Sequence, residues 1–583
     1  MDIFKRLGWF FKQEKNSYLM GVLALVIVAL LQLIPPRIIG IVVDEIETGI
    51  ITSASLTQWL VILASTAIGQ YLLRYLWRVK IWGNAAKLEK IVRNQLYDHF
   101  TNMDNEFFQK YRAGDLMAHA TNDLRGLRMV AGGGILTMAD AISVGLTTLI
   151  AMAFVVDWRL TLIAIIPLPF LAIASRVLGK KLHVLFRDAQ AAFSQLNNKV
   201  QESIQGIKVV KTFGQEKEDI EDFDKETENV VAKNKAVYKI DSLFDPTITF
   251  IMGIAYFLTI FVGGLLITNN EITIGDFVTF INYIGMLVWP MFAIGRLFNI
   301  IERGSASYDR IENLLREETS IEERHGAVDK PISGDLTFSI EEFNYPDSNE
   351  PTLTNINFTL KAGGTLGIVG KTGAGKTSII KLLLREYDHY KGNIEYGNYD
   401  IRDYSLDALL KHIGYVPQDN YLFSDTIREN IRFADPTLAQ SAVEAAAKLA
   451  NIHEDILELP NGYDTEVGER GVSLSGGQKQ RISIARAILI NPELMILDDS
   501  LSAVDAKTEE SILSGLKDIR SGQTTIIAAH RISSVMHAEE IIVVEDGTIV
   551  ERGTHEELLE MDGWYKHMYE QQQLERKLEG AEE

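Results

Sequence analysis

The sequence contains no cysteine, and this absence removes two kinds of chemistry at once. Without a thiol the chain forms no disulfide and holds no metal through cysteine ligands, which fits a protein that faces the cytosol. Positive charge is also scarce, since 57 Lys and Arg stand against 78 Asp and Glu, a formal net charge of −21. This acidic balance argues against nucleic acid as a main partner.

The N-terminal stretch lacks the features of a secretory signal. Residues 1–17 are amphipathic and basic, but they contain neither a long apolar core nor a small-residue cleavage site. We therefore predict a helix that lies at the membrane surface before the first span. A disordered start is the alternative.

The composition is mixed, with 47% hydrophobic and 23% charged residues over 583 positions. This mixture indicates an apolar membrane part joined to a polar soluble part, and so more than one domain. Six segments of the first half are apolar and long enough to cross a bilayer. They are 18–43, which contains Pro35 and Pro36, then 59–76, 135–156, 160–178, 246–267 and 277–300.

The loops between these spans predict their orientation. Residues 44–56 and 268–274 contain no Lys or Arg, whereas 78–128 and 180–239 are rich in both. By the positive-inside tendency, the two long loops and both termini are cytoplasmic. Helical patterns continue into these loops and break near Gly114 and at Gly206 or Gly214. We expect short helices at these reversals that dock on a soluble domain; a solvated hairpin is the alternative.

The strongest motif of the second half is GKTGAGKT, residues 370–377, which matches the P-loop pattern. It follows a short apolar run that predicts a buried strand and precedes a helix start at Ser378. Such a loop wraps phosphates with backbone N–H groups at the positive end of the helix. Lys376 would contact the β- and γ-phosphates, and the Thr377 hydroxyl would hold Mg²⁺.

A second phosphate-site element is LMILDD, residues 494–499, an apolar strand that ends in two carboxylates. Asp498 would bind Mg²⁺ through water, because hard cations prefer oxygen ligands. Asp499 would stand where an attacking water must be oriented. A buried strand with an acidic end is the structural alternative, and the P-loop makes it the weaker one.

Between these two elements lies LSGGQ, residues 474–478, and the three motifs in this order resemble the signature set of ABC transporters. Other family elements follow in their expected order. Tyr345 resembles the aromatic residue that stacks on adenine, Gln418 the Q-loop glutamine, and His530 the switch histidine. TEVGER at 465–470 resembles the X-loop that contacts the membrane domain, and SAVD at 502–505 resembles the D-loop.

The resemblance covers nearly the whole chain and is strongest to bacterial multidrug half-transporters of the BmrC, LmrC and EfrC type. It implies an α-helical six-span membrane domain of the ABC exporter type fused to an α/β P-loop nucleotide-binding domain. The expected division is an amphipathic helix at 1–17, the membrane domain at 18–320, a linker at 321–335, the nucleotide-binding domain at 336–572 and an acidic tail at 573–583.

In this family two nucleotide-binding domains meet head to tail and enclose two ATP molecules. The resemblance implies that this chain binds one ATP itself, through Tyr345, Gly370, Lys371, Thr372, Gly373, Ala374, Gly375, Lys376, Thr377 and Ser378. It would contact the ATP of the partner through Ser475, Gly476, Gly477, Gln478 and Asp505. The implied catalytic residues are Asp499, His530 and Gln418, and the implied Mg²⁺ ligands are Thr377, Gln418 and Asp498. The cytoplasmic loops are expected to dock near Gln418 and on the X-loop.

One position departs from the family pattern, because the residue after Asp498 is usually Glu and here is Asp499. The shorter side chain withdraws the carboxylate by about one methylene, and a misplacement of ~1 Å can cost ~10²-fold in rate. A weak base beside an intact LSGGQ predicts a heterodimer in which a second half-transporter carries the catalytic Glu. A homodimer that tolerates Asp is the alternative.

The substrate is predicted only as a class. The sixth span is rich in aromatic residues, and a cavity lined by them would suit hydrophobic, amphipathic compounds; packing or lipid contact explains at least half of them equally well. They are Phe277, Phe280, Tyr283, Trp289, Phe292 and Phe298. Polar residues within spans, which are Gln32, Gln70, Arg74 and Asp140, are expected to face the bundle interior. A lipid or peptide exporter of the same fold stays open.

Overall fold

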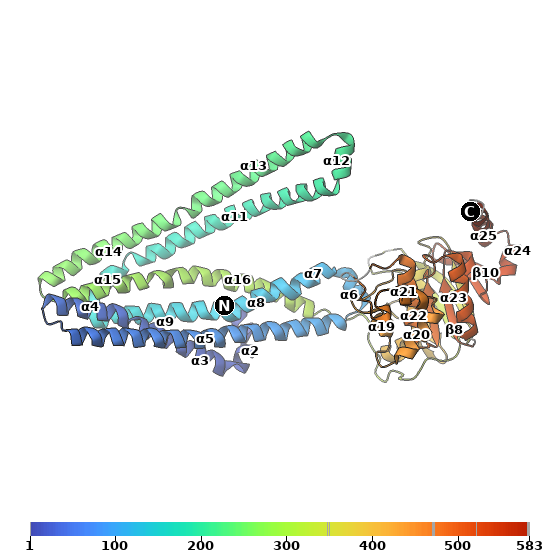
Figure 1. Ribbon diagram of the computed structural model, residues 1–583, viewed down its shortest axis with the longest axis horizontal. Coiled ribbons are helices and arrows are strands. Elements are labelled where there is room, and N and C mark those ends of the chain that lie inside the picture. Colours follow the sequence, from blue (N-terminus) through green and yellow to red (C-terminus); the bar gives the residue numbers. More distant parts are fainter. Residues whose placement is uncertain (1, 347, 349, 469–472, 520–521, 580–583) are drawn as a thin grey trace. The chain divides into compact units, whose positions relative to one another are not determined.

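The computed structural model describes residues 2–346, 348, 350–468, 473–519 and 522–579 (Figure 1). The chain divides into two compact units. The first comprises Met1–Thr101 and Ala113–Glu317, and the second comprises Asn102–Arg112 and Glu318–Glu583. The second unit therefore includes a short piece of the first cytoplasmic loop, which agrees with the expected docking of a loop helix on the soluble domain.

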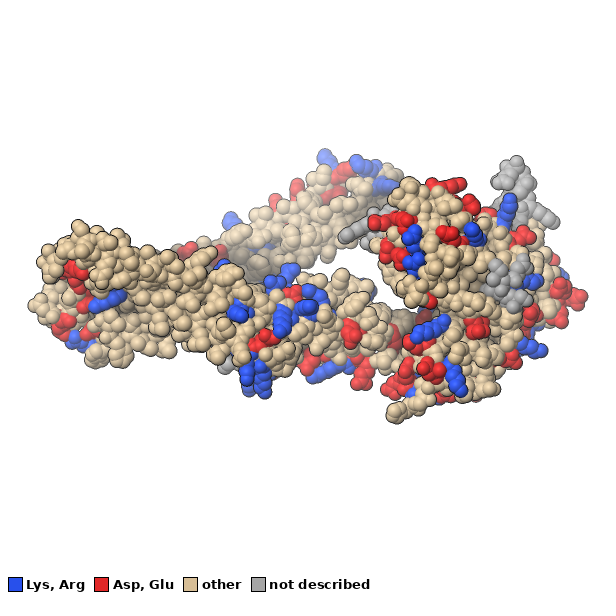
Figure 2. Space-filling model, turned by 60° about the horizontal axis from the view of Figure 1, so that its bottom comes forward, with Lys and Arg blue, Asp and Glu red and all other residues tan. Residues whose placement is uncertain are grey.

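Six helical segments of the described chain are long and apolar enough to cross a membrane, and each contains one of the predicted spans. They are Lys15–Glu47, Ser53–Thr101, Ala113–Val156, Trp158–Gln205, Glu216–Thr268 and Ile274–Leu315. Large side chains such as Leu60, Phe154 and Phe257 are exposed on them. Figure 2 shows the result as a broad surface with few charges over the spans. The six-span prediction is confirmed.

All the membrane segments except the second consist of consecutive helices. The first is α3 (Lys15–Gln32) followed by α4 (Ile34–Glu47), and the second is α5 (Ser53–Thr101). The third contains α9 (Ile135–Ala151), and the fourth contains α10 (Trp158–Ile165) and α11 (Leu168–Gln205). The fifth contains α14 (Phe244–Thr268), and the sixth contains α15 (Ile274–Met286) and α16 (Val288–Leu315).

The N-terminal stretch is helical, in α1 (Asp2–Arg6) and α2 (Gly8–Gln13). Its apolar side chains Ile3, Leu7 and Phe10 are fully buried, and Arg6 pairs with Asp309 and Glu312 of α16. The predicted helix is confirmed, but protein rather than a membrane surface covers its apolar face.

The two cytoplasmic loops reverse differently. In the second loop, α11 and α13 (Glu216–Asp241) pack along each other with α12 (Ile207–Phe213) between them (Figure 1). Breaks therefore occur at both predicted glycines, Gly206 and Gly214. In the first loop, α6 (Asn105–Lys110) ends before Tyr111, which is extended, and α7 spans Ala113–Ala118. The break predicted at Gly114 thus lies before it, and Gly114 is helical.

The second unit is α/β, as predicted. Its larger sheet has the strand order β10-β9-β3-β8-β7-β6 and is parallel except for β10. The strands are β3 (Thr365–Val369), β6 (Ile413–Val416), β7 (Leu494–Asp498), β8 (Thr524–Ala528), β9 (Glu540–Glu545) and β10 (Thr548–Gly553). All five residues of β7 are buried. The carboxyl ends of parallel strands share one edge, where ligands of such sheets bind.

A smaller antiparallel sheet completes the unit, with the order β2-β1-β4-β5. Its strands are β1 (Leu336–Phe343), β2 (Leu353–Leu360), β4 (Lys391–Tyr396) and β5 (Tyr399–Asp400). The last helix, α25 (Trp564–Glu579), runs through the start of the predicted tail. Residues 573–579 are therefore helical.

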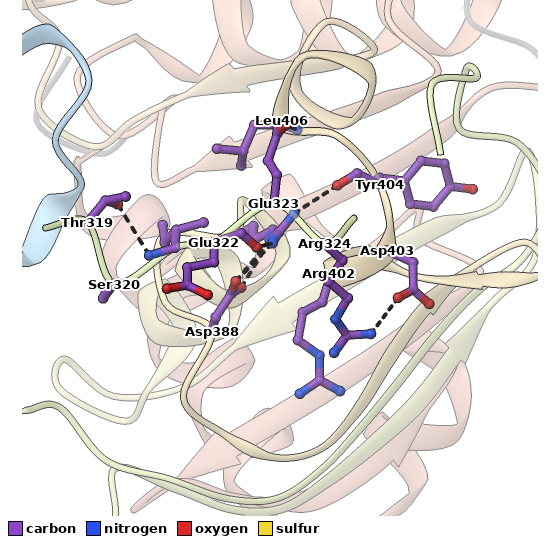
Figure 3. Close-up of polar contacts among 12 residues, drawn as sticks. Thr319, Ser320, Glu322, Glu323, Arg324, Asp388, Arg402, Asp403, Tyr404 and Leu406 are labelled. Carbon is purple, nitrogen blue, oxygen red and sulfur yellow. Dashed lines mark hydrogen bonds and ion pairs between the residues drawn. The ribbon is translucent and has the colours of Figure 1, made fainter. Parts of the chain in front are cut away.

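The segment predicted as a linker is fastened to this unit by polar contacts (Figure 3). Arg385, which is 1% exposed, donates hydrogen bonds to the carbonyls of Glu322 and Tyr404. The Glu323 carboxylate accepts from the Leu406 amide at 2.9 Å, and Arg324 pairs with Asp403. A buried guanidinium with this many partners holds the linker to the domain.

Of the polar span residues, Gln70 donates to the Leu31 carbonyl at 3.2 Å and so faces the bundle. Gln32 and Asp140 are half-buried, but Arg74 is exposed, so the prediction is wrong for Arg74. The aromatic residues of the sixth span also differ in how far they are buried. Phe280 and Tyr283 are buried, Phe277 and Phe292 are half-buried, and Trp289 and Phe298 are exposed.

Candidate nucleotide-binding site

The P-loop joins β3 to the helix α17 (Lys376–Leu383), whose N-cap is Gly375. Gly370 has φ +151°, and a Cβ there would lie 2.1 Å from the Val544 carbonyl oxygen. Gly375 has φ +109°. Because side chains would clash or be strained at these positions, glycine lets the backbone close into a phosphate-sized loop.

The Lys376 ammonium is folded into this loop. Its Nζ donates to the carbonyls of Gly370 at 2.9 Å and Lys371 at 3.1 Å. Burial lowers the pKa of Lys376, and the carboxylates of Asp499 and Asp498 oppose that shift. A charged group held among carbonyls and carboxylates is poised to exchange those partners for phosphate oxygens. Lys371 instead reaches outward to Glu545, at 2.6 Å.

Asp498 and Thr377 meet at the end of β7, where the Thr377 hydroxyl lies 3.4 Å from Asp498 Oδ1. Asp498 is 3% exposed, and burial raises its pKa. Its Oδ2 is buried without a hydrogen-bond partner among the described residues. A buried carboxylate oxygen beside a hydroxyl has the chemistry that Mg²⁺ prefers, so these two residues fit the ion.

Asp499 follows in a left-handed conformation, with φ +47°. Its backbone N–H donates to Ala528 at 2.7 Å, and its Oδ1 accepts from the His530 N–H at 3.4 Å. The carboxylate is therefore directed toward the loop that carries His530. An Asp in this region of φ costs less than most residues would, because its short side chain bonds locally.

His530 follows β8 and lies against the P-loop lysine, with Nε2 3.4 Å from Lys376 Nζ. Burial lowers the pKa of His530, and the Lys376 charge lowers it further. The shift favours the neutral imidazole. A neutral ring keeps one nitrogen free to accept, and the other to donate, a hydrogen bond.

The remaining residues predicted for this site lie around it. The Tyr345 hydroxyl bonds Ser378 Oγ at 2.9 Å, so the aromatic ring stands next to the P-loop helix. Gln418 follows β6, and the register Val416↔Leu497 places it beside the end of β7. The Gln418 side chain is exposed and bonds none of the described residues, whereas its carbonyl accepts from Asn420.

The signature motif begins the helix α22 (Gly476–Leu489). Ser475 is the N-cap, and a capping box joins it to Gln478, with N–O distances of 3.0 and 3.2 Å. Gly477 lets the helix approach the D-loop, since a Cβ there would lie 2.9 Å from the Ala503 carbonyl. No described contact joins the signature to the P-loop of the same chain. The signature and the P-loop of one chain therefore lie on separate surfaces.

The sequence did not predict the structural role of Gln480. Its amide donates to the Asp499 carbonyl at 3.4 Å and accepts from the Ala503 N–H at 3.1 Å. It therefore ties the signature helix to the end of β7 and to the D-loop. A glutamine in a helix carries no sequence signal for this role. In the D-loop, Asp505 caps the next helix by accepting from the Thr508 N–H, which lowers the pKa of Asp505.

The X-loop is described in part. Thr465 is buried and its carbonyl accepts from Ile427 N–H. Glu469 and Arg470 of the predicted motif lie outside the described residues.

The helix α6 docks within the same unit, on the segment that follows the P-loop helix. Gln109 Nε2 donates to the Tyr387 hydroxyl at 2.6 Å, and Asn105 Nδ2 donates to Glu386 at 2.6 Å. Tyr387 in turn contacts the Tyr345 ring edge-on, at 5.3 Å between centroids. No hydrogen bond or ion pair among the described residues joins α6 to Gln418, so the contacts found for the first loop are those with Glu386 and Tyr387.

Comparisons with known proteins agree with this geometry. Residues 18–291 match the family model of the ABC transporter transmembrane region, and residues 353–502 match the ABC transporter model. The chain belongs to the ABC transporter family. It is a half-transporter of an ATP-driven exporter, in which the membrane domain and the ATPase domain are fused in one chain. It is a multi-pass membrane protein, and its nucleotide-binding domain is cytoplasmic.

Relatives and a solved structure resemble the chain along nearly its whole length. The chain is 44% identical over 580 residues to a protein of Bacillus subtilis named "Probable multidrug resistance ABC transporter ATP-binding/permease protein YheI", with 100% of this chain and 99% of that one covered. It is 43% identical to the "Multidrug resistance-like ATP-binding protein MdlA" of Escherichia coli, with the same coverage. A solved bacterial Atm1-family ABC exporter with ATP bound matches 96% of this chain and 99% of its own, at 26% identity and a TM-score of 0.78.

Proposed function

We propose that this chain is one subunit of an exporter that uses ATP to move hydrophobic or amphipathic compounds, including several drugs, out of the cell. The multidrug names of relatives that match it end to end support this substrate class. A lipid or peptide exporter has the same fold, and the substrate decides between them. In the proposed cycle ATP would bind at Gly370–Ser378 and Tyr345. Thr377, Asp498 and Gln418 would hold Mg²⁺, which would supply neutralisation of phosphate charge.

We infer that a second chain completes the ATP site. The signature and the P-loop of this chain make no described contact with each other, so Ser475–Gln478 and Asp505 are available to the ATP of a partner. The exposed helix α12 supports a paired assembly too, since none of its described residues is buried. We propose that α12 docks on the nucleotide-binding domain of that partner.

The site built on this P-loop is proposed to hydrolyse ATP poorly. Asp499 is one methylene shorter than the usual Glu, and its carboxylate already accepts the His530 N–H. Both features draw the oxygen back from the position of an attacking water, where ~1 Å matters. The partner would then be a different half-transporter with Glu at the matching place. A homodimer that tolerates Asp is the competing assembly.

The deciding experiment is purification of the tagged chain from its native membrane with identification of what accompanies it. ATP hydrolysis is then measured for two variants of that complex. Asp499→Asn is expected to lower turnover only modestly, and the matching Glu→Gln of the partner to lower it ~10²- to 10⁴-fold, the usual contribution of a general base. A fully active complex of this chain alone would show that the homodimer is correct.

A further inference from the structure

One carboxylate within the spans has an unusual partner. Asp140 lies on α9, and its Oδ2 accepts a hydrogen bond of 2.9 Å from the indole Nε1 of Trp289, near the start of α16. Asp140 is half-buried, and Trp289 is 46% exposed. The pair is therefore an accessible carboxylate at the N–H edge of an indole ring.

The break between α15 and α16 brings these residues together. α15 ends at Met286 and α16 begins at Val288, so Trp289 and Pro290 lie in the first turn after the break. Pro290 suits that turn because it has no N–H to donate. Gly145 of α9 faces this turn, and a Cβ there would lie in van der Waals contact with the Pro290 ring, at 3.5 Å. The indole consequently lies over α9.

The depth of the pair follows from helix geometry. From Asp157, at the outer end of the third span, to Asp140 is roughly 25 Å at 1.5 Å per residue. From Ile274 to Trp289 is roughly 22 Å by the same measure. The hydrocarbon core is about 30 Å thick. Both residues thus lie in the part of the membrane nearest the cytoplasm.

Asp140 has no cationic partner among the described residues, unlike three other acidic residues of the spanning segments. Asp276 pairs with Arg37, and Asp157 and Glu271 pair with Arg159. Among the described residues Asp140 forms no ion pair, with Arg296 of α16 included, and its Oδ1 accepts no hydrogen bond. An ionisable residue within a span points by default to a functional site.

We propose that Asp140 and Trp289 form a recognition site for lipophilic organic cations that enter from the inner leaflet. The carboxylate supplies a negative charge opposite to that of the ligand. The exposed indole attracts the cation and stacks on its apolar body. The inference rests on the proposed export function and narrows it to a charge class. Neutral substrates are exported without needing Asp140.

The test uses the complete complex in vesicles and two dyes, the permanent cation ethidium and the neutral amphipathic dye Nile red. Asp140→Asn is expected to raise the KM for ethidium at least 10-fold while the KM for Nile red and the basal ATPase stay within about 2-fold. Asp140→Glu restores part of the ethidium affinity. Trp289→Leu raises the ethidium KM about 5-fold, whereas Trp289→Phe, which keeps a ring, has a smaller effect. Trp158→Leu, at an exposed Trp of the outer end, is the matched control.

Equal losses for both dyes would mean that Asp140 is structural, and an unchanged ethidium KM would mean that it does not touch the cation; either result overturns the site. Export of Nile red alone by the natural complex overturns it too. A natural complex that exports neither dye contradicts the proposed function itself. If the Asp140→Asn complex is not recovered, the test uses Asp140→Glu and Trp289→Leu, which both keep a carboxyl group at position 140. A larger rise in the KM for ethidium than for Nile red in these variants then supports the site, and equal changes overturn it.

Discussion

The short helices at the tips of the two cytoplasmic loops have opposite environments. α6 is capped by Asp104, and its polar side chains bond Glu386 and Tyr387 of the nucleotide-binding unit. α12 lies between two glycines, and its side chains Val209 and Phe213 are 60% and 72% exposed. The first helix is already part of a domain of its own chain, and the second still presents an apolar surface.

This difference indicates that the two loop helices have different roles. The contacts of α6 are hydrogen bonds to buried groups, which fix position because an unpaired buried group is costly. The exposed apolar side chains of α12, which include Val209 and Phe213, gain free energy only when another surface covers them. We infer that α6 anchors the first cytoplasmic loop on the nucleotide-binding unit, and that α12 transmits movement between chains.

The largest expected effect comes from making α12 polar. Val209→Asp with Phe213→Asp should reduce transport at least 10-fold while ATP hydrolysis continues, because a charged face cannot dock on an apolar one. Vesicle uptake and phosphate release measured on the same sample separate the two activities. Ile220→Asp, at an equally exposed position of α13, is the control. Unchanged transport in the double variant would remove the coupling role from α12.

The contact of α6 offers the next effect. Gln109→Leu leaves the buried Tyr387 hydroxyl poorly paired, at a cost of about 1–3 kcal/mol, so hydrogen exchange in residues 102–112 should rise about 5- to 100-fold. Adding Tyr387→Phe removes the orphaned group and should recover much of the loss. Burial raises the pKa of Tyr387 to about 12, so the phenol is neutral throughout the measurement. A double variant as loose as the single one would contradict this pairing.

Asp104 predicts a pH dependence that α12 should not share. Burial alone would raise the pKa of Asp104, but hydrogen bonds from Phe107, Ser320 and Thr319 outweigh it and hold the pKa below its ordinary value. A lowered carboxyl pKa contributes stability that is complete above the ordinary value and lost as the pH falls through the lowered one. Exchange in 102–112, corrected for intrinsic rate, should therefore be flat from pH 7 to 5 and rise below about pH 4.

Asp104→Asn should abolish that acid step and loosen α6 slightly at neutral pH. A residual step of the same size in the Asn variant would assign it to another carboxylate.

The smallest effect is expected at the pair His389–Glu106, with Nδ1 3.1 Å from the carboxylate. The His389 side chain is 42% exposed, and pairs of this kind contribute about 0–1 kcal/mol. Glu106→Gln should change exchange in α6 less than 5-fold. A larger change than Gln109→Leu produces would reverse the ranking of contacts that hold the helix.

The sequence predicted the spans because bilayer thickness imposes a length and a hydropathy that no soluble helix needs. It predicted Lys376, Asp498 and His530 because phosphate chemistry restricts residue types at short spacing. It could not predict that α6 bonds Glu386 and Tyr387, since these polar residues are distant in sequence and carry no pattern. It likewise placed the N-terminal helix at the membrane surface, because an amphipathic pattern shows an apolar face but not what covers it.

The grouping of Asn102–Arg112 with Glu318–Glu583 has a consequence for exchanging parts between transporters. An ATPase domain cut from this chain by sequence alone lacks eleven residues of its own surface and exposes Tyr387 and Glu386. A chimera that joins this ATPase to a foreign membrane domain would meet a loop helix with other side chains. The interchangeable module of this protein is therefore discontinuous, and a graft that transfers both pieces together is the one that should assemble.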